Sequence, residues 1–423
     1  MDYLAIPRAR RLEGEVRVPP SKSATNRALV LAALSATPVE IARPLESVDT
    51  AALLHCLGAM GARIAVSPDC LTISGPLGVS GSSQTPLDAA DSGTAARFLA
   101  AVAAATSGRF LLDGSARLRQ RPMAELVEAL RSAGARIAYR GEEGFLPLAI
   151  EGGTLGCGTV VVDAGRSSQF LSALLLSAVA LEGGLTVRPA GEVASAPYVE
   201  ATIGALEAFG HGVEREGSAV TVTRGARVPG RYAVPGDDSS AVPLLAAVGA
   251  AGGRVAVSGL APGSRAADAR ALPVLEKMGI SLGSAGDRVT ASFAGGPLEA
   301  VRVDAGQFPD SVPPLAALAA LARGESRFEG IGHLRLKESD RIGALAGLLT
   351  AAGGTAREEE TALVVKGGLA PGGVVVLPTF GDHRIAMAAA LLALARGGCL
   401  IENPGCVAKS YPAFFRDLAT LLH

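Results

Sequence analysis

One pattern of residues recurs six times along the 423-residue chain. Each repeat begins with a helical stretch of small apolar residues, and the polar residues of that stretch gather at its start. The six stretches are KSATNRALVLAALSA (22–36), DSGTAARFLAAVAAA (91–105), SSQFLSALLLSAVAL (167–181), DDSSAVPLLAAVGAA (237–251), DSVPPLAALAALA (310–322) and DHRIAMAAALLALA (382–395). Counted at Ser23, Asp91, Ser167, Asp238, Asp310 and Asp382, successive repeats lie 68, 76, 71, 72 and 72 residues apart. Such repetition implies that each repeat folds as one supersecondary unit.

A β-rich run follows each helical stretch, and a second helical pattern follows that run. The second pattern ends on a glycine, which supplies the left-handed residue that terminates a helix. These glycines are Gly61, Gly134, Gly210, Gly279 and Gly353. One or two alternating strands complete most repeats, but the sixth ends in the helix-like segment 408–423. We therefore expect the strand-like N-terminal segment 3–20 to complete the sixth repeat.

The number of repeats favours two domains, because a chain of this length rarely forms a single core. The Pro/Gly-rich stretch 228–240 predicts a seam between the third and fourth repeats. We expect an inserted domain of residues 19–235 and a discontinuous domain of residues 1–18 plus 236–423. We expect the fold class α/β (α+β), with six units that each read helix, strand, helix, strand, strand, and with three parallel helices in each domain core. Helix N-termini attract anions, so we expect an active site in the cleft between two anion-binding faces.

Composition excludes several functional classes. Charged residues make up 19% of the chain and the net charge is −1, so no general attraction to nucleic acid or anionic membrane is expected. The apolar stretches fall short of the roughly 18–20 residues of a membrane span, and MDYLAIPRARR lacks the apolar segment of a secretory signal. Five cysteines without CxxC spacing indicate reduced thiols and a cytoplasmic protein, with no metal site.

The first repeat places basic residues where a helix begins. Lys22, Ser23 and Arg27 open its helical stretch. Positive groups beside the positive end of a helix are unfavourable unless an anion neutralises them. The segment therefore favours phosphate or carboxylate binding, although an ordinary solvated helix start capped by serine remains an alternative.

The second repeat adds backbone access and arginines. Asp91 is a good N-cap, and Gly93 and Thr94 let a ligand approach the backbone closely. Beyond this stretch three arginines alternate: Arg117, Arg119 and Arg121. In a strand-like segment all three would lie on one side, where they could bind an oxyanion. A solvated charged face is the simpler alternative.

Neutral hydrogen-bonding residues open two helices of the third repeat. Ser167, Ser168 and Gln169 form a polar triplet that suits hydroxyls and phosphate oxygens, and capping alone would explain only one serine. Ser195 and Tyr198 stand at another helix start, where a simple cap with a packed tyrosine explains them equally well.

Acid–base groups appear in the second half of the chain. Asp310 stands at a helix start, and His383 with Arg384 opens the sixth helical stretch. Lys337 and Arg341 are expected on one helical face, where like charges are unfavourable without an anion between them. The remaining polar candidates are Glu338, Asp340 and Lys409. Each motif alone has a structural explanation, but their recurrence in corresponding positions favours function.

Together these motifs resemble the 5-enolpyruvylshikimate-3-phosphate synthase family over nearly the whole chain. The motifs that carry the resemblance are PSKSATNRA, DSGTAARF, RxRPM, SSQFLSALL, PDS, LKESDR and GDHRIAMA, in this order. The resemblance implies a two-domain enolpyruvyl-transferase fold with six βαβαββ-type units, three in each domain. It also implies transfer of the enolpyruvyl group of phosphoenolpyruvate to the 5-hydroxyl of shikimate 3-phosphate, through a tetrahedral intermediate and without a metal or organic cofactor.

The resemblance also assigns residues to each substrate. For shikimate 3-phosphate it implies Lys22, Ser23, Arg27, Ser167, Ser168, Gln169, Ser195, Tyr198, Asp310, His333 and Lys337. For phosphoenolpyruvate it implies Lys22, Asp91, Gly93, Thr94, Arg121, Gln169, Arg341, Arg384 and Lys409. The expected catalytic residues are Asp310, Glu338, Lys22 and His383, with Asp310 as the base toward the hydroxyl. Whether Glu338 or Lys22 moves the proton at C3 stays open.

The chain departs from the family pattern at two of these positions. Asp91 replaces the more common asparagine, so it must be protonated, paired or turned away from phosphoenolpyruvate. His333 stands where asparagine is also found, and either could hydrogen-bond the substrate ring. Gly93 leaves room beside the phosphate of phosphoenolpyruvate.

Two alternatives remain open at this point. UDP-N-acetylglucosamine enolpyruvyl transferase shares the chemistry, but it carries Lys-Asn in place of Lys22-Ser23 and a loop cysteine in the region of 114–121, which this chain lacks. A non-catalytic repeat scaffold could also bind anions, but it would gain nothing from Asp310 and Glu338 among basic residues. We expect small-molecule substrates, no nucleic acid or membrane partner, and a monomer.

Overall fold

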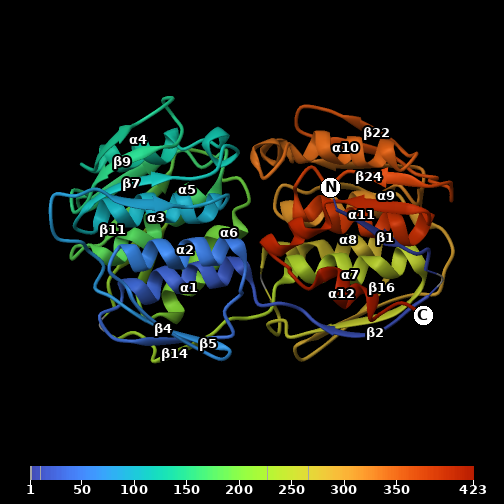
Figure 1. Ribbon diagram of the computed structural model, residues 1–423, viewed down its shortest axis with the longest axis horizontal. Coiled ribbons are helices and arrows are strands. Elements are labelled where there is room, and N and C mark those ends of the chain that lie inside the picture. The colour runs from blue at the N-terminus through green and yellow to red at the C-terminus, as the bar shows by residue number, and fades with distance from the viewer. Residues whose placement is uncertain (1, 10, 226, 265) are drawn as a thin grey trace. The chain divides into compact units, whose positions relative to one another are not determined.

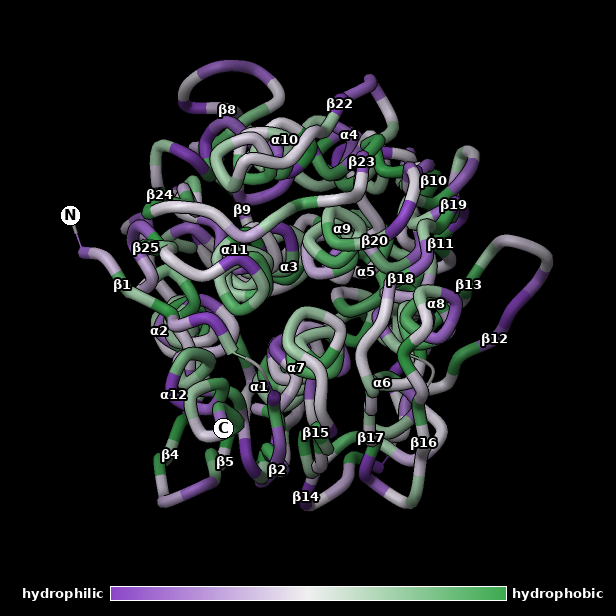
Figure 2. Tube along the Cα trace, turned by 90° about the vertical axis from the view of Figure 1, so that its right-hand side faces the viewer, coloured by the Kyte–Doolittle hydropathy of each residue, from purple (hydrophilic) through white to green (hydrophobic). Residues whose placement is uncertain are grey.

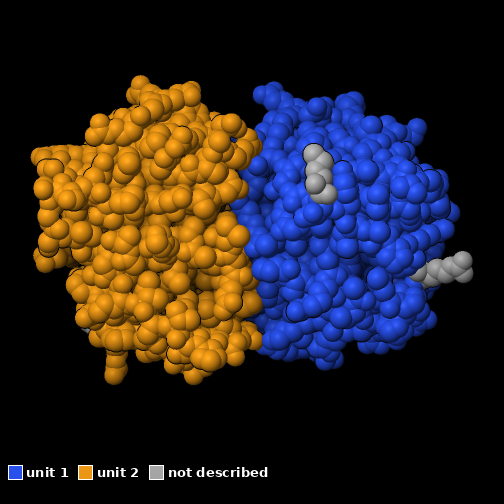
Figure 3. Space-filling view, viewed as in Figure 1, with its two compact units in different colours: residues 1–19, 235–423 blue, residues 20–234 orange. Residues whose placement is uncertain are grey.

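The chain divides into two compact units (Figure 3). The computed structural model describes residues 2–9, 11–225, 227–264 and 266–423. Unit 1 consists of residues 1–19 and 235–423, and unit 2 consists of residues 20–234. Each unit contains a hydrophobic core of its own.

Unit 2 contains the first three repeats (Figure 1). The first comprises α1 (Lys22–Leu34), β3 (Val39–Ala42), α2 (Val48–Ala59), β4 (Arg63–Ser67) and β5 (Cys70–Ser74). The second comprises β6 (Thr85–Asp88), α3 (Gly93–Ala105), β7 (Arg109–Asp113), the 3₁₀ turn η1 (Leu118–Gln120), α4 (Ala124–Ser132), β8 (Arg136–Tyr139) and β9 (Leu148–Glu151). The third comprises β10 (Gly158–Val162), α5 (Ser168–Ser177), η2 (Ala178–Ala180), β11 (Leu185–Pro189), α6 (Pro197–Ala208), β12 (Gly212–Glu216) and β13 (Ala219–Thr223), and β14 (Arg231–Ala233) follows.

Unit 1 contains the last three repeats and the N-terminal strands β1 (Tyr3–Ile6) and β2 (Leu12–Arg17). The fourth repeat comprises α7 (Asp238–Ala251), β15 (Gly253–Ser258), η3 (Ala267–Ala271), α8 (Leu272–Lys277), β16 (Ser281–Ala285) and β17 (Arg288–Phe293). The fifth comprises β18 (Leu298–Glu299), β19 (Arg302–Asp304), η4 (Pro309–Ser311), α9 (Val312–Ala319), β20 (Ala322–Arg323), β21 (Glu325–Glu329), η5 (Gly332–Leu336), α10 (Arg341–Ala351), β22 (Thr355–Glu358) and β23 (Leu363–Lys366). The sixth comprises β24 (Val375–Leu377), α11 (His383–Arg396), β25 (Cys399–Glu402), η6 (Pro404–Lys409) and α12 (Phe414–Ala419).

The same four-stranded sheet recurs in five repeats. The strand orders are β14-β3-β5-β4, β6-β7-β9-β8, β10-β11-β13-β12, β2-β15-β17-β16 and β19-β21-β23-β22. In each sheet the first two strands are parallel and the third is antiparallel to the second. Parallel neighbours need a crossover connection, and α3, α5 and α9 provide it within their repeats.

Two of these sheets receive their first strand from a different repeat. β14 precedes α7 in sequence but pairs in parallel with β3 of the first repeat. β2 precedes α1 in sequence but pairs in parallel with β15 of the fourth repeat. The chain thus forms β2 in unit 1 just before it enters unit 2, and it forms β14 in unit 2 just before it returns to unit 1.

The N-terminal segment serves two repeats rather than one. β1 pairs antiparallel with β25, in the third place of the sixth sheet β24-β25-β1. The expectation that segment 3–20 completes the sixth repeat is thus right for β1 and wrong for β2. β2 belongs to the fourth repeat because its six residues are in register with Gly253–Ser258.

Small apolar residues allow one helix of each repeat to be buried on all sides. In α3 every residue except Thr94 and Ala105 is buried, and α11 is buried almost throughout. Apolar residues around the whole circumference are typical of a core helix. α3 packs against α5, and α11 packs against both α7 and α9 (Figures 1 and 2).

The predicted helix stops are confirmed. All five predicted glycines have positive φ, between 77° and 102°. Among the described residues, no helix is both long and apolar enough to cross a membrane.

Candidate functional site

The first residue of α1, Lys22, forms an ion pair and is still partly exposed to solvent. Ser21 is the N-cap and accepts a hydrogen bond from the Ala24 backbone at 3.3 Å. The Lys22 Nζ lies 3.2 Å from Asp49 Oδ2, and the Lys22 side chain is 15% exposed. Asp49 lies in the first turn of α2. It was not predicted as a site residue, because its favourable interaction with the helix dipole already explains an acidic residue at a helix start.

Arg27 lies one turn further into α1 and organises its surroundings. Its guanidinium donates to the backbone oxygen of Ser23 at 2.9 Å and to the Ser23 hydroxyl at 2.5 Å. It also donates to Thr202 Oγ1 and to the Tyr198 backbone oxygen, both at 2.8 Å on α6. Burial lowers the pKa of Arg27 to about 10, so it remains charged at neutral pH. Arg27 thus fixes Ser23 and the first turn of α6.

At the start of α3, Ser92 rather than Asp91 is the N-cap. Ser92 accepts a hydrogen bond from the Ala95 backbone at 3.2 Å. The capping role expected for Asp91 is therefore wrong, because the helix begins two residues later, at Gly93. The Ser115 hydroxyl donates to Asp91 Oδ1 at 2.9 Å, so this carboxylate is paired.

Two arginines lie against the first residue of α3. A Cβ on Gly93 would come within 2.5 Å of Arg121 Cζ and 2.4 Å of Arg97 Nη1. Arg97 donates to the Gly93 oxygen at 3.1 Å and to the Pro122 oxygen at 2.9 Å. Glycine is therefore required here so that the Arg121 guanidinium can reach the helix start.

The expectation that three arginines share one side of a strand is wrong. Residues 118–120 form the 3₁₀ turn η1, in which successive side chains point about 120° apart. Arg119 instead pairs with Asp113 on the surface, and Arg117 donates to Gln120 at 3.1 Å. Of these arginines, Arg121 alone is buried.

The predicted polar triplet opens α5. Ser167 is the N-cap and accepts from the Gln169 backbone at 3.3 Å, and Ser168 is the first helical residue. The Gln169 side-chain amide donates to Thr94 Oγ1 at 3.0 Å, which joins the starts of α5 and α3. Ser195, a buried residue with φ of 55°, precedes α6. Hydrogen bonds therefore join the start of α5 to that of α3, as Arg27 joins α1 to the start of α6.

In unit 1, a single arginine binds three carboxylates. Arg341 is the first residue of α10, and its side chain is only 1% exposed. It donates to Asp310 Oδ1 at 2.7 Å, Asp382 Oδ2 at 2.8 Å and Glu338 Oε2 at 2.9 Å. Burial acts to lower the pKa of Arg341, but the charges of Asp382, Glu338 and Asp310 outweigh it and raise the pKa well above its usual value. Arg341 is therefore a permanent cation.

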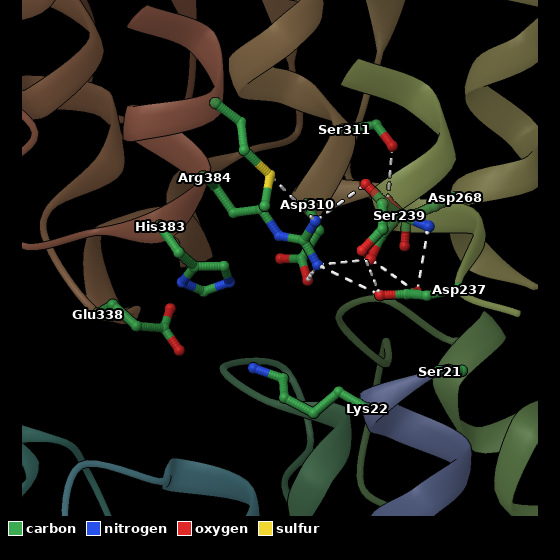
Figure 4. Close-up of polar contacts among 12 residues, drawn as sticks. Ser21, Lys22, Asp237, Ser239, Asp268, Asp310, Ser311, Glu338, His383 and Arg384 are labelled. Carbon is green, nitrogen blue, oxygen red and sulfur yellow. Dashed lines mark hydrogen bonds and ion pairs between the residues drawn. The ribbon is translucent and has the colours of Figure 1, made fainter. Parts of the chain in front are cut away.

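A second buried arginine, Arg384, lies beside Asp310 (Figure 4). Arg384, near the start of α11, donates to the Ser239 backbone oxygen at 2.9 Å and to the Ser239 hydroxyl. Its Nη2 lies 3.5 Å from Asp310 Oδ2 and 4.0 Å from Asp237 Oδ2. Because these contacts join the starts of α7 and α11 with the turn before α9, the three core helices begin at one place.

Asp310 is a carboxylate rather than a carboxylic acid. Burial acts to raise its pKa, but the positive charges of Arg384, Arg341 and Lys337 outweigh burial and hold the pKa far below its usual value. Its side chain is 23% exposed, compared with 1% for Arg341. Asp310 can therefore accept a hydrogen bond from a ligand while both arginines hold it.

The other predicted residues of unit 1 surround this cluster. His383, the first residue of α11, has Nδ1 3.6 Å from Asp382 Oδ1. His333 lies in η5, where burial and then the positive charge of Lys337 lower the pKa of His333 to about 3, so its imidazole is neutral. Lys409 is the last residue of η6.

Lys337 and Arg341 do not share a helical face, contrary to the prediction. Lys337 has an extended backbone after η5, and Asp340 caps α10, which begins only at Arg341. Asp340 accepts hydrogen bonds from the first-turn backbone, at 3.2 Å from both Ile342 and Gly343. The helical spacing of Lys337 and Arg341 therefore gives no reason to expect an anion between them.

Sequence reasoning missed the outer carboxylates of this cluster. Asp237 and Asp382 cap α7 and α11, so helix capping alone explained them. Asp268 on η3 accepts a hydrogen bond from the Ser311 hydroxyl at 2.7 Å. Asp268 lies in the sequence SRAADARA, which shows no signal of a site.

The two clusters differ in what they can do chemically. Unit 2 offers cations with neutral donors, which suit a phosphorylated, hydroxylated ligand. Unit 1 offers a deprotonated carboxylate, Asp310, and further carboxyl groups held by buried arginines, which suit proton transfer beside a negatively charged group. Among the described residues, no group of His, Cys, Asp and Glu could hold a metal ion.

Comparisons with known proteins agree with one another. The family model described as EPSP synthase (3-phosphoshikimate 1-carboxyvinyltransferase) matches residues 6–418. A 3-phosphoshikimate 1-carboxyvinyltransferase from Tolumonas auensis is 37% identical, covering 100% of this chain and 99% of the relative. Another from Thermococcus kodakarensis is 42% identical, covering 97% and 98%.

Solved structures show the same relationship. EPSP synthase from Acinetobacter baumannii is similar with a TM-score of 0.79 and 26% identity, over 99% of this chain and 98% of that chain. The enolpyruvyl transferase NikO from Streptomyces tendae has a TM-score of 0.78 at 23% identity, over 99% and 97%, and this similarity concerns the fold alone.

Proposed function

Because the chain belongs to the EPSP synthase family, we infer that it transfers the enolpyruvyl group of phosphoenolpyruvate to the 5-hydroxyl of shikimate 3-phosphate and releases phosphate. The observation that carries this inference within the molecule is Asp310, a charged carboxylate between the buried Arg341 and Arg384. A protein that only binds anions gains nothing from such a carboxylate, whereas an addition to a double bond needs a base next to cations.

Shikimate 3-phosphate is assigned to donors of unit 2 and to groups around Asp310. Ser167, Ser168 and Gln169 offer first-turn hydroxyls and an amide at the start of α5, where a phosphate is favoured. Ser23 is held for the same ligand by its bonds to Arg27. The other groups assigned to this substrate are Lys22, Ser195, Tyr198, His333 and Lys337.

Phosphoenolpyruvate is assigned to arginines, because guanidinium groups bind carboxylates and phosphates through paired hydrogen bonds. Arg121 beside Gly93 and the buried pair Arg341 and Arg384 would hold its two anionic groups. The remaining groups assigned to it are Lys22, Asp91, Thr94, Gln169 and Lys409. Since Asp91 is bonded to Ser115, its charge is partly compensated there.

The reaction follows as addition and then elimination. The 5-hydroxyl oxygen forms a bond to C2 of phosphoenolpyruvate, its proton passes to Asp310, and C3 receives a proton from Glu338 or Lys22. The tetrahedral adduct then loses phosphate, and C3 gives up a proton to restore the double bond. The cations stabilise the departing phosphate, and His383 is assigned a supporting role beside Asp382.

Neither cluster of residues is sufficient for this reaction alone. We propose that the residues of both units act on one pair of substrates in a cleft between the domains. Closure of the domains would exclude water from the anionic intermediates. We also propose that the protein acts as a monomer in the cytoplasm; its five free thiols are typical of a reducing compartment.

The function is tested by measuring phosphate release from phosphoenolpyruvate with two acceptors, shikimate 3-phosphate and UDP-N-acetylglucosamine. Release with shikimate 3-phosphate alone is expected, because Ser23 replaces the asparagine of the nucleotide-sugar enzymes. Release with the nucleotide sugar alone would assign the chain to the other reaction. Release with neither acceptor, in folded protein, would favour an anion-binding scaffold.

A further inference from the structure

Asp268 has no role in the reaction as proposed, yet it is tied to the residue next to Asp310. The Ser311 hydroxyl donates to Asp268 Oδ1 at 2.7 Å (Figure 4). Ser311 is fully buried and Asp268 is 4% exposed. The bond connects η3 of the fourth repeat with η4 of the fifth, so it is a tertiary contact rather than a local one.

The position of Ser311 shows that its hydroxyl does not serve the helix. Ser311 is the N-cap residue of α9, where a serine usually accepts a hydrogen bond from the second or third helical N–H. Those two positions are Pro313 and Pro314, and proline has no N–H to donate. The Ser311 side chain accordingly makes no capping bond. Its hydroxyl instead donates to Asp268, in another repeat.

The turn that carries Asp310 is closed by a backbone hydrogen bond, from the Ser311 N–H to the Phe308 oxygen at 3.1 Å. η4 spans only Pro309–Ser311 and has no side-chain cap. Asp310 must nevertheless direct one oxygen to Arg341, at 2.7 Å, and the other to Arg384, at 3.5 Å. A small rotation of η4 would lengthen one of these contacts.

We propose that Asp268 is a positioning residue for the reaction: through Ser311 it holds η4 so that the Asp310 carboxylate stays between Arg341 and Arg384, aimed at the substrate hydroxyl. This inference rests on the proposed function of Asp310 as the base. Misplacement of a reacting group by about 1 Å can reduce turnover a hundredfold, so a partial loss of orientation is expected to be visible.

Charged groups from three other elements face Asp268. They are Asp310 on η4, Arg384 on α11 and Asp237 at the start of α7. Burial and then the negative charge of Asp310 raise the pKa of Asp268 to about 7, so it carries a proton for part of the time at neutral pH. A neutral side chain of the same shape is therefore expected to replace it with little loss.

The test uses kcat and KM of phosphate release in three single variants and one double variant. Ser311→Ala and Asp268→Ala remove the bond, and kcat is expected to fall about five- to thirtyfold while KM for both substrates changes less than about threefold. Asp268→Asn keeps an oxygen that can accept from Ser311, so kcat should remain within about threefold of the original chain. The double variant Ser311→Ala/Asp268→Ala should lose no more than either single variant, because both act through one bond.

A matched control is available in the same unit. Ser264 donates to Asp238 Oδ2 at 2.9 Å, a bond of the same kind that does not touch η4. Ser264→Ala should leave kcat unchanged, and thermal unfolding shows that each variant is folded.

Three results would overturn the inference: unchanged kcat in Ser311→Ala, an equal loss in Ser264→Ala, or Asp268→Asn as impaired as Asp268→Ala. Failure of the function itself is distinguishable, because then the original chain would release no phosphate either.

Discussion

Arg341 and Arg384 define what Asp310 can do. Each guanidinium is buried, and Asp310 is shared between them. A buried arginine without carboxylates would be strongly unfavourable, so the carboxylates stabilise the cations and the cations keep the base deprotonated. The arginines proposed to bind phosphoenolpyruvate are thus also those that hold the Asp310 carboxylate in its charged form.

His333 provides a test of this electrostatic environment. The pKa of His333 is lowered to about 3, from an ordinary value near 6.5, by burial and by the charge of Lys337. Between these values the unfolded chain binds a proton that the folded chain does not, so stability decreases as pH falls through this window. Between pH 6.5 and 5, the free energy of unfolding of His333→Asn should therefore decrease by about 1–2 kcal/mol less than that of the original chain.

The measurement is the free energy of unfolding in urea at several pH values. His55→Asn, at an exposed position of α2, serves as the control for removal of a histidine from the surface. An identical pH dependence in His333→Asn and in the original chain would contradict the account.

At the scale of elements, many of the residues proposed to bind the substrates lie at helix starts, where a glycine allows a side chain to approach the backbone closely. A Cβ on Gly93 would lie 2.5 Å from Arg121 Cζ. Gly93→Ala should therefore displace Arg121 and raise KM for phosphoenolpyruvate about tenfold or more, with less than about a threefold change for shikimate 3-phosphate. Steady-state kinetics checks this. Gly204→Ala in α6, where a Cβ meets nothing within 4 Å, should leave both KM values unchanged.

The positions of most helices could be predicted from the sequence, because the signals that start and stop a helix lie within a few residues of its ends. Helix starts and stops follow from small residues, polar caps and glycines such as Gly61 and Gly353, whose effect spans only a few residues. The pairing of β2 with β15 could not be predicted, because strand partners are chosen by contacts distant in sequence. Asp49 and Asp268 were missed for a related reason: their surroundings in sequence offered an ordinary explanation, and their partners come from other elements.

At the scale of the whole molecule, the strand exchange makes each unit complete in its own sheets. Unit 2 contains every strand of its three sheets, including β14, and its own core. A chain of residues 20–234 alone is therefore expected to unfold cooperatively in urea and to release no phosphate from phosphoenolpyruvate. Loss of cooperative unfolding in this fragment would show that unit 2 depends on unit 1 for its fold, contrary to the account.

The central claim is that the charged Asp310 is the base of an enolpyruvyl transfer. It is tested most directly by single-turnover phosphate release with Asp310→Asn, alongside calorimetric binding of shikimate 3-phosphate. The account predicts that release slows by about 10²–10⁴-fold, as for loss of a general base, while the dissociation constant of shikimate 3-phosphate changes less than about tenfold. Release at the original rate by Asp310→Asn would contradict the claim and place the base elsewhere.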